Sequence, residues 1–74
     1  MSRKYAVVFE QAETNWAAYV SDLPGCISTG KTFDETKRNV QEAISGHLQT
    51  LLAFGEQIPE PTIIATEIEV VSVS

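Results

Sequence analysis

The stretch S-D-L-P-G-C-I-S-T-G, residues 21–30, contains the two turn signals that decide how this chain folds. Pro24 has a fixed φ and Gly25 is free to adopt a positive φ, which is the pair of properties typical of a β-turn. Gly30 offers a second permissive backbone position directly before a helix start. Between these signals Cys26–Thr29 is short and tolerant of β structure, so we predict a strand there.

A long amphipathic helix is predicted directly after this stretch. Thr32 with Glu35 three residues later forms a capping box, and Asp34 suits the positive end of the helix dipole. Gly55 is well placed as the residue beyond the last turn, which predicts a helix of roughly 22 residues. One face is expected to be buried, because apolar side chains and a histidine recur at spacings of three and four: Phe33, Val40, Ile44, His47, Leu48 and Leu51.

Three further strands are predicted outside the opening stretch. Tyr5–Phe9 is apolar on both faces, which favours a central position in a sheet. Trp16–Val20 follows after a polar loop of about five residues, so the two strands should form a hairpin. After the helix, residues 59–61 (Pro-Glu-Pro) force an extended linker, and Ile63–Val73 alternates like a half-buried strand.

The predicted fold is therefore α+β, with the element order β-β-β-α-β and one long helix packed on one face of the sheet. A strand–helix–strand crossover normally gives a parallel pair, so the four-stranded sheet is expected to be mixed, in the order 3-2-1-4. The face without the helix still carries apolar side chains from the first two strands, and we predict that a second copy of the chain covers them. A homodimer or higher homo-oligomer is expected.

Length and charge exclude several classes of protein. The 74 residues suffice for one domain, and the net charge of −5, from 10 acidic and 5 basic residues, repels phosphate backbones and suits a basic partner. No apolar run approaches the roughly 20 residues that span a bilayer, and residues 1–5 lead into a strand pattern without a signal-peptide core. We expect a cytoplasmic protein with no membrane partner and no direct contact to nucleic acid by this chain alone.

No constellation for catalysis or metal binding is evident. Cys26 cannot form an internal disulfide, and its candidate base, His47, lies on or beside the apolar helix face, so packing is favoured over a nucleophilic role. The carboxylates are scattered, and residues 25–30 lack the Lys-Ser/Thr of a phosphate loop. We predict no enzyme activity and no cofactor or metal. A residual nuclease or small-molecule-binding domain stays open, and metal-dependent RNA cleavage abolished by Glu10→Gln or Asp22→Asn would support it.

The residues around the predicted turn, third strand and helix start also resemble the signature of HicB-like antitoxins, which runs approximately D-L-P-G-C-x-T-x-G-x-T-x-x-E-A-x-x-N-A-x-E-A. Residues 55–61 resemble the G-x-x-I-P-x-P segment that follows the helix in this family. Ser28 stands for the usual Thr, Thr36 and Val40 for the usual Ala, and Ser21 where Pro is common. The matching residues, for which we expect structural roles, are Asp22, Leu23, Pro24, Gly25, Cys26, Gly30, Thr32, Glu35, Asn39, Glu42 and Ala43.

The resemblance implies a partial ribonuclease-H-like fold without that enzyme's catalytic carboxylates. It also implies a function: such proteins bind and neutralise HicA, a small basic toxin that has a double-stranded-RNA-binding fold and cleaves mRNA. An acidic chain suits this role, because it can cover a basic RNA-binding surface. We therefore expect an antitoxin whose partner is a HicA-type toxin.

Many members of this family carry a C-terminal helix-turn-helix or ribbon-helix-helix segment that binds DNA. The pattern here predicts a single HicB-like domain over residues 1–74, without a C-terminal DNA-binding domain. An alternative is an orphan homo-oligomeric domain with a regulatory or interaction role and no cognate toxin. A short basic reading frame beside the gene favours the antitoxin, and its absence favours the orphan domain.

Overall fold

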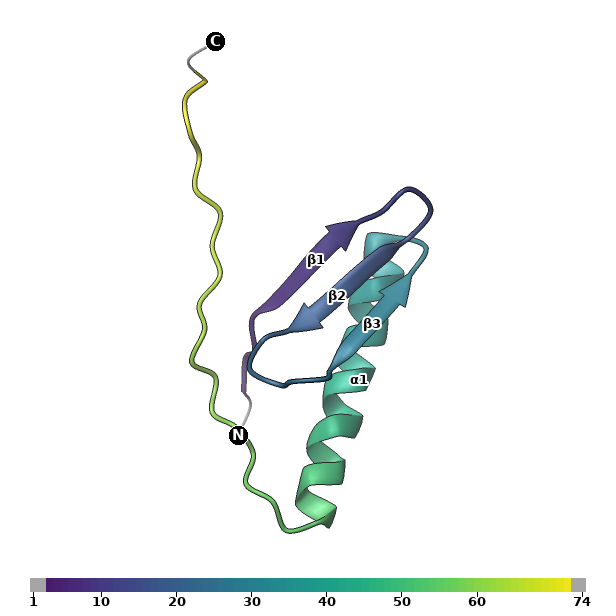
Figure 1. Cartoon of the computed structure of the whole chain (residues 1–74), viewed down its shortest axis with the longest axis vertical. Helices are drawn as coiled ribbons and strands as arrows, with labels where there is room; N and C mark the ends of the chain where they lie inside the picture. Colours follow the sequence, from purple (N-terminus) through teal and green to yellow (C-terminus); the bar gives the residue numbers. More distant parts are fainter. Residues whose placement is uncertain (1–2, 73–74) are drawn as a thin grey trace.

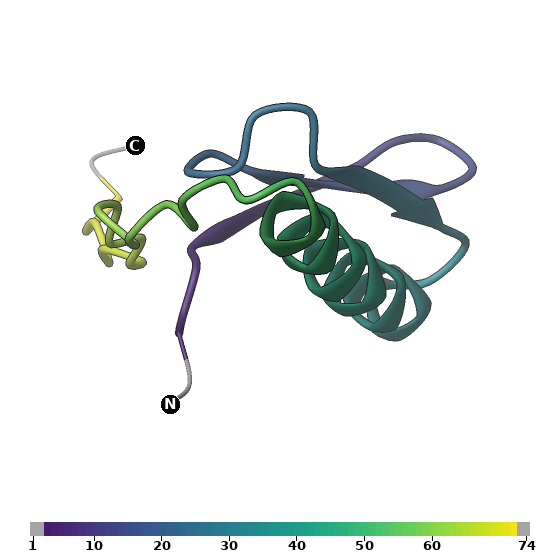
Figure 2. The same ribbon diagram turned by 90° about the horizontal axis from the view of Figure 1, so that it is seen from below.

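The computed structural model describes residues 3–72, which contain three strands and one helix. They follow in the order β1 (Val7–Gln11), β2 (Trp16–Val20), β3 (Ile27–Gly30) and α1 (Phe33–Ala53). The strands form one antiparallel sheet in the order β1-β2-β3, and α1 lies across one face of it (Figures 1 and 2). This confirms the predicted α+β class, the first three strands and the helix on a single face.

The β1–β2 hairpin is longer than its sequence pattern indicated. β1 covers Val7–Gln11 instead of the expected Tyr5–Phe9, so it begins and ends two residues later. The N–H of Ala12 donates to the carbonyl of Asn15 (2.8 Å), which closes the loop with two residues between them. The expected loop was too long because the backbone pairing with β2 continues over Glu10 and Gln11. The polar side chains of these two residues remain exposed on the edge strand.

The core lies between α1 and the sheet. Leu23 and Cys26 reach it from the turn between β2 and β3, and Val40 reaches it from α1. Thr36 is also fully buried, and its hydroxyl donates to the carbonyl of Thr32 (2.7 Å), so the polar group is satisfied. The apolar side chains of the core and its margin are Ala18, Val20, Leu23, Cys26 and Val40, with Tyr5, Val7, Phe9, Ala43, Ile44 and Leu48 packed against them.

The two glycines of the opening stretch are required for different reasons. Gly25 has a φ of +84°, as expected for the turn, and the space around it is open. Gly30 does not have a positive φ, because it is the last residue of β3 and is paired with Trp16. A Cβ on Gly30 would lie 2.5 Å from Oγ1 and 2.8 Å from the backbone N of Thr36. Gly30 therefore provides room for the first turns of α1, and the expected conformational role is replaced by a steric one.

Both helix ends follow the predicted signals. The Thr32 side chain accepts the N–H of Glu35 (3.0 Å), and the Glu35 carboxylate accepts the N–H of Lys31 (3.1 Å). At the other end Gly55 has a φ of +71°, and its N–H donates to the carbonyl of Leu52 (3.1 Å). The capping box and the glycine that follows the helix are confirmed, and α1 has 21 residues.

The fourth strand, predicted at Ile63–Val73, is not found in the described part of the chain, and Val73 lies outside it. Residues 63–71, here called the C-terminal arm, are extended and stand apart from the sheet (Figures 1 and 2). Of the predicted order 3-2-1-4, the part 3-2-1 is confirmed, but no fourth strand lies beside β1 in residues 3–72, so β1 is an edge strand instead of a central one. The radius of gyration is 14.6 Å, whereas a compact chain of this length has about 11 Å.

Candidate interaction surfaces

Asp22 fixes the base of the C-terminal arm to the turn after β2. Its Oδ2 accepts the N–H groups of Thr62 (2.9 Å) and Ile63 (3.2 Å), and its Oδ1 accepts the Thr62 hydroxyl (2.6 Å). The hydrogen bond from the Thr62 hydroxyl, followed by that from its N–H, holds the pKa of Asp22 below its ordinary value of 3.8. The Tyr5 hydroxyl donates to the carbonyl of Pro59 (2.6 Å). These contacts explain why the arm departs from the sheet: its first residues are held beside the turn.

The other residues of the HicB-like signature surround the junction of the turn, β3 and α1. Leu23 and Cys26 are buried, and Asn39 donates from Nδ2 to the carbonyl of Thr29 (2.9 Å), which ties α1 to β3. Glu42 is exposed on α1 and Ala43 packs against the core. Three of the signature residues, Gly25, Cys26 and Ala43, line one shallow groove between the turn and α1, and the others are spread along the turn and the helix. Asp22, Leu23, Pro24, Gly25 and Cys26 form the turn and its exit, Gly30, Thr32 and Glu35 form the entry to α1, and Asn39, Glu42 and Ala43 lie on α1.

The structure offers little support for nucleophilic chemistry at Cys26. The residue is 5% exposed, and burial raises the pKa of its thiol. Cys26 and His47 line the same shallow groove between the turn and α1, so the structure does bring the two residues into one neighbourhood. Within residues 3–72, no group of three or more His, Cys, Asp and Glu side chains could hold a metal ion.

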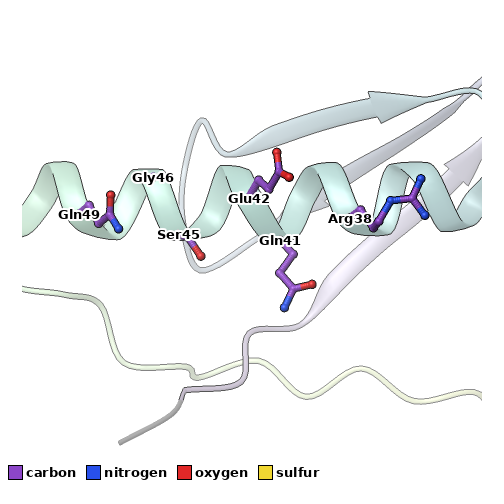
Figure 3. Close-up of a pocket in the computed structure, with 6 residues that line it drawn as sticks. All are labelled: Arg38, Gln41, Glu42, Ser45, Gly46 and Gln49. Atoms are coloured by element: carbon purple, nitrogen blue, oxygen red, sulfur yellow. The ribbon is translucent and has the colours of Figure 1, made fainter.

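The outer face of α1 carries a polar surface. Arg38, Gln41, Glu42, Ser45, Gly46 and Gln49 line a shallow depression there. Figure 3 shows that all six come from this one helix and that Gln41 and Glu42 point in different directions. A surface of this kind can meet a polar partner, but it has no second wall that would enclose a small ligand.

The sheet face opposite α1 carries a row of apolar side chains. Val8, Tyr19 and Ile27 are direct neighbours in the β1–β2 and β2–β3 registers, so they form one row across all three strands. They are 46%, 37% and 56% exposed, respectively. The predicted apolar groups on the uncovered face are thus present, and β3 adds a third member that the sequence interpretation had not included.

The C-terminal arm is the most exposed apolar segment of the described chain. Ile64, Ile68 and Val70 are 93%, 80% and 81% exposed. They share one side of an extended chain by alternation, while Glu67 and Glu69 share the other. The arm therefore has the side-chain pattern of a strand although it is unpaired with the sheet.

The negative charge is concentrated in the second half of the chain. Residues 1–38 contain five acidic and five basic side chains and are neutral. Beyond Arg38 there is no Lys or Arg, and five glutamates account for the net charge of −5: Glu42, Glu56, Glu60, Glu67 and Glu69. A basic partner is therefore attracted chiefly to α1 and to the segment that follows it. No helix in the described range has the length and hydropathy of a membrane span.

Comparisons with known proteins point to one family. The sequence profile described as "HicB_like antitoxin of bacterial toxin-antitoxin system" matches residues 5–72. A chain of a solved HicA3 and HicB3 toxin–antitoxin complex is similar in structure, with a TM-score of 0.69 and 27% identity over 81% of this chain and 70% of that chain.

Curated relatives include proteins of a bacteriophage, a bacterium and an archaeon. A 14.9 kDa protein of Haemophilus phage HP1 is 36% identical over 56 residues, and UPF0150 proteins of Helicobacter pylori and Thermoplasma acidophilum are 44% identical over 46 residues and 37% identical over 57. The matches cover 76%, 62% and 76% of this chain. They span 42% of the phage protein, 64% of the Helicobacter protein and 83% of the Thermoplasma protein.

Proposed function

Since this chain belongs to the HicB-like antitoxins of bacterial toxin–antitoxin systems, we propose that it binds and neutralises a small basic HicA-type toxin. The observation that carries the proposal is the family match over residues 5–72. The similarity to a chain of the HicA3–HicB3 complex supports it, because that structure is itself a toxin–antitoxin assembly.

The charge distribution supports a mechanism of electrostatic occlusion. The glutamates beyond Arg38 lie on α1, on the linker and on the arm, and this half contains no Lys or Arg. Glu60 forms an ion pair with Arg3 of the other half (3.8 Å). A basic RNA-binding surface is complementary to such a segment, and complementary fields accelerate association and disfavour competing partners. Neutralisation then follows by exclusion, since a toxin surface covered by this chain cannot admit mRNA.

We assign the chain a binding role instead of a catalytic one. Asp22, one of the three acidic residues of the signature, uses both carboxylate oxygens to hold the arm. Glu42 faces solvent on α1, and the shallow groove around it comes from a single helix (Figure 3). Within the described chain these carboxylates serve structure and surface charge, which fits an antitoxin that acts by contact.

A co-expression experiment tests this function. A small basic HicA-type toxin from the same source should be expressed with a tag, and the chain should co-purify with it. RNA cleavage by the toxin should stop near one equivalent of this chain. Failure to bind or inhibit a catalytically active HicA-type toxin from the same source would overturn the proposal.

Paired charge variants test the mechanism. Glu67→Gln/Glu69→Gln should slow association with the toxin by about tenfold at low salt, and the difference should shrink as salt screens the charges. The control Glu10→Gln/Glu13→Gln removes the same charge from the neutral half and should change association less. Equal effects of the two pairs would show that net charge matters but its position does not.

The apolar row on the open sheet face favours a second role, self-association. We propose that a second copy covers Val8, Tyr19 and Ile27. In a monomer these apolar side chains would stay in contact with water. As an orphan domain without a toxin, the chain would act through this homo-oligomer alone. Light scattering at micromolar concentration should give a mass above the 8.1 kDa of one chain, and a monomer would contradict self-association.

A further inference from the structure

The outer edge of β1 is unpaired in the described sheet, and the register shows which backbone groups face it. The N–H of Val20 donates to the carbonyl of Cys26 (3.2 Å), so the backbone groups of Val20 are directed toward β3 and away from β1. Val7, which lies opposite Val20, therefore directs its N–H and C=O away from the sheet. Phe9 and Gln11 lie two and four residues further along β1, so their N–H and C=O groups are directed away from the sheet as well. An unpaired row of this kind is a template for an added strand.

A partly apolar groove lies beside this edge. It is lined by Tyr5, ahead of β1, and by Ile44 and Leu48 of α1, with Arg3, Gln41 and Ser45 at its polar margin. Tyr5, Ile44 and Leu48 also pack against the core, so the groove is continuous with it. A strand added to β1 would direct alternate side chains toward the α1 side of the sheet. The edge and the groove together can therefore accept both the backbone and the apolar side chains of an extended segment.

The C-terminal arm has the properties of such a segment. It is already extended, and Ile64, Ile68 and Val70 lie on one side of it in contact with solvent. Its nine residues span about 30 Å and the five residues of β1 about 17 Å, so the arm can cover β1 and still bridge two molecules. The side that carries Glu67 and Glu69 would face away from α1.

The arm does not occupy the edge of its own β1. The hydrogen bonds that the N–H groups of Thr62 and Ile63 donate to Asp22 hold its first residues beside the turn, and the arm then runs clear of the sheet in both views (Figures 1 and 2). Each copy therefore carries an unpaired strand-like segment and an unpaired edge. In two copies related by a two-fold axis, the arm of each copy can pair with the β1 edge of the other. Exchange of an identical element in this way is a low-cost route to a dimer.

We propose that the C-terminal arm of one copy adds as a strand to the β1 edge of a second copy, and that the second copy returns the same contact. Ile64, Ile68 and Val70 then cover the groove formed by Tyr5 and Ile44 and its neighbours. The proposal rests on the self-association proposed above, assigns its main contact to the arm and the β1 edge instead of the row of Val8, Tyr19 and Ile27, and does not depend on a toxin. Glu67 and Glu69 stay exposed in the dimer and available to a basic partner.

The first test compares substitutions on the two sides of the arm. Wild-type chain should sediment as a dimer, twice the mass of the 8.1 kDa chain. Ile68→Lys/Val70→Lys should raise the dissociation constant of the dimer by at least ~100-fold, because the substitutions affect both arm–edge contacts of a symmetric dimer. The matched control Glu67→Lys/Glu69→Lys places two lysines on the other side and should leave the dimer intact. Circular dichroism should show α1 unchanged in all three, since the arm lies outside the core.

The second test asks whether arm and edge belong to different copies. A synthetic full-length chain with an N-methyl group on Phe9 loses one outward N–H but keeps its side chain, and it should be monomeric. Mixed with the Ile68→Lys/Val70→Lys chain, it should form a heterodimer by native mass spectrometry, because one intact arm then meets one intact edge. Neither variant alone can form that junction.

Each other outcome overturns the exchange in a recognisable way. A wild-type monomer whose arm amides resist hydrogen exchange would place the arm on its own β1, and a monomer with unprotected arm amides would exclude pairing altogether. A dimer that survives Ile68→Lys/Val70→Lys would be held by another surface, such as the row of Val8, Tyr19 and Ile27, and self-association would stand without exchange. Monomeric variants that fail to complement each other would also exclude it.

Discussion

Gly30→Ala tests the closest approach between the sheet and α1. The new Cβ would lie 2.5 Å from Oγ1, 2.8 Å from N and 3.1 Å from Cα of Thr36. Two of these atoms belong to the backbone of the helix, so a side-chain rotation cannot relieve the contact. The first turns of α1 must move away from β3, and the buried hydrogen bond from Thr36 to Thr32 is strained as they do.

The expected cost is a large share of the total stability. Overpacking of this kind costs about 1–3 kcal/mol, and a weakened buried hydrogen bond costs about 1 kcal/mol. We expect the free energy of unfolding to fall by about 2–4 kcal/mol, out of roughly 4–11 kcal/mol for a domain of this length. The melting temperature should fall by at least ~8 °C.

Thermal melting by circular dichroism measures this effect, and two further substitutions control it. Gly46→Ala, at an exposed position inside α1 with no atom near the new Cβ, should raise stability by about 0.5–1 kcal/mol. In a Thr36→Ala background the closest atom is absent, so Gly30→Ala should cost about 1 kcal/mol less. If Gly30→Ala melts at the wild-type temperature, the steric role assigned to Gly30 is refuted.

Three other predictions concern the turn and its contacts. Gly25→Val should lower stability by about 1–2 kcal/mol, because the residue has a φ of +84° although the space around it is open, and an unchanged melting curve would contradict this. Asp22→Asn should accelerate hydrogen exchange at the amides of Thr62 and Ile63 while α1 stays intact; unchanged exchange would show that the carboxylate does not hold the arm. Since the pKa of Asp22 is lowered, its contribution is complete above pH 3.8 and is lost as the pH falls through the lowered value, so wild type should resemble the variant only in acid. Cys26 should react with a small alkylating reagent at pH 8 at least ~10-fold more slowly in the native than in the unfolded chain, because burial raises its thiol pKa, and equal rates would contradict its burial.

Features set by neighbouring residues could be predicted from the sequence. The helix start was predictable because its hydrogen bonds are local: the Thr32 side chain accepts the N–H of Glu35, and the Glu35 carboxylate accepts the N–H of Lys31. Gly55 marked the helix end because a left-handed residue after the last turn favours glycine. Trp16–Val20 was predicted with the observed bounds, since its apolar run is short and is bracketed by polar residues.

Features that depend on distant contacts were not predictable in the same way. The alternation in residues 63–71 correctly indicates an extended segment, but alternation does not say which edge, or which copy, pairs with it. The role of Asp22 was missed because its partner Thr62 is 40 residues away and no local pattern connects the two. The requirement for Gly30 was attributed to φ, because the proximity of Thr36 becomes visible only when α1 is packed on β3.

The contact between Asp22 and Thr62 also has a consequence for the order of folding. The two hairpins and α1 join residues that are close in sequence, and such local contacts form quickly because they close short loops. The contact between Asp22 and Thr62 spans 40 residues and adds no residue to the buried core. It can therefore form last and open first, while the sheet and α1 remain folded. In the arm exchange proposed above, the arm would therefore meet a partner's edge after its own domain is complete, and assembly would follow folding instead of competing with it.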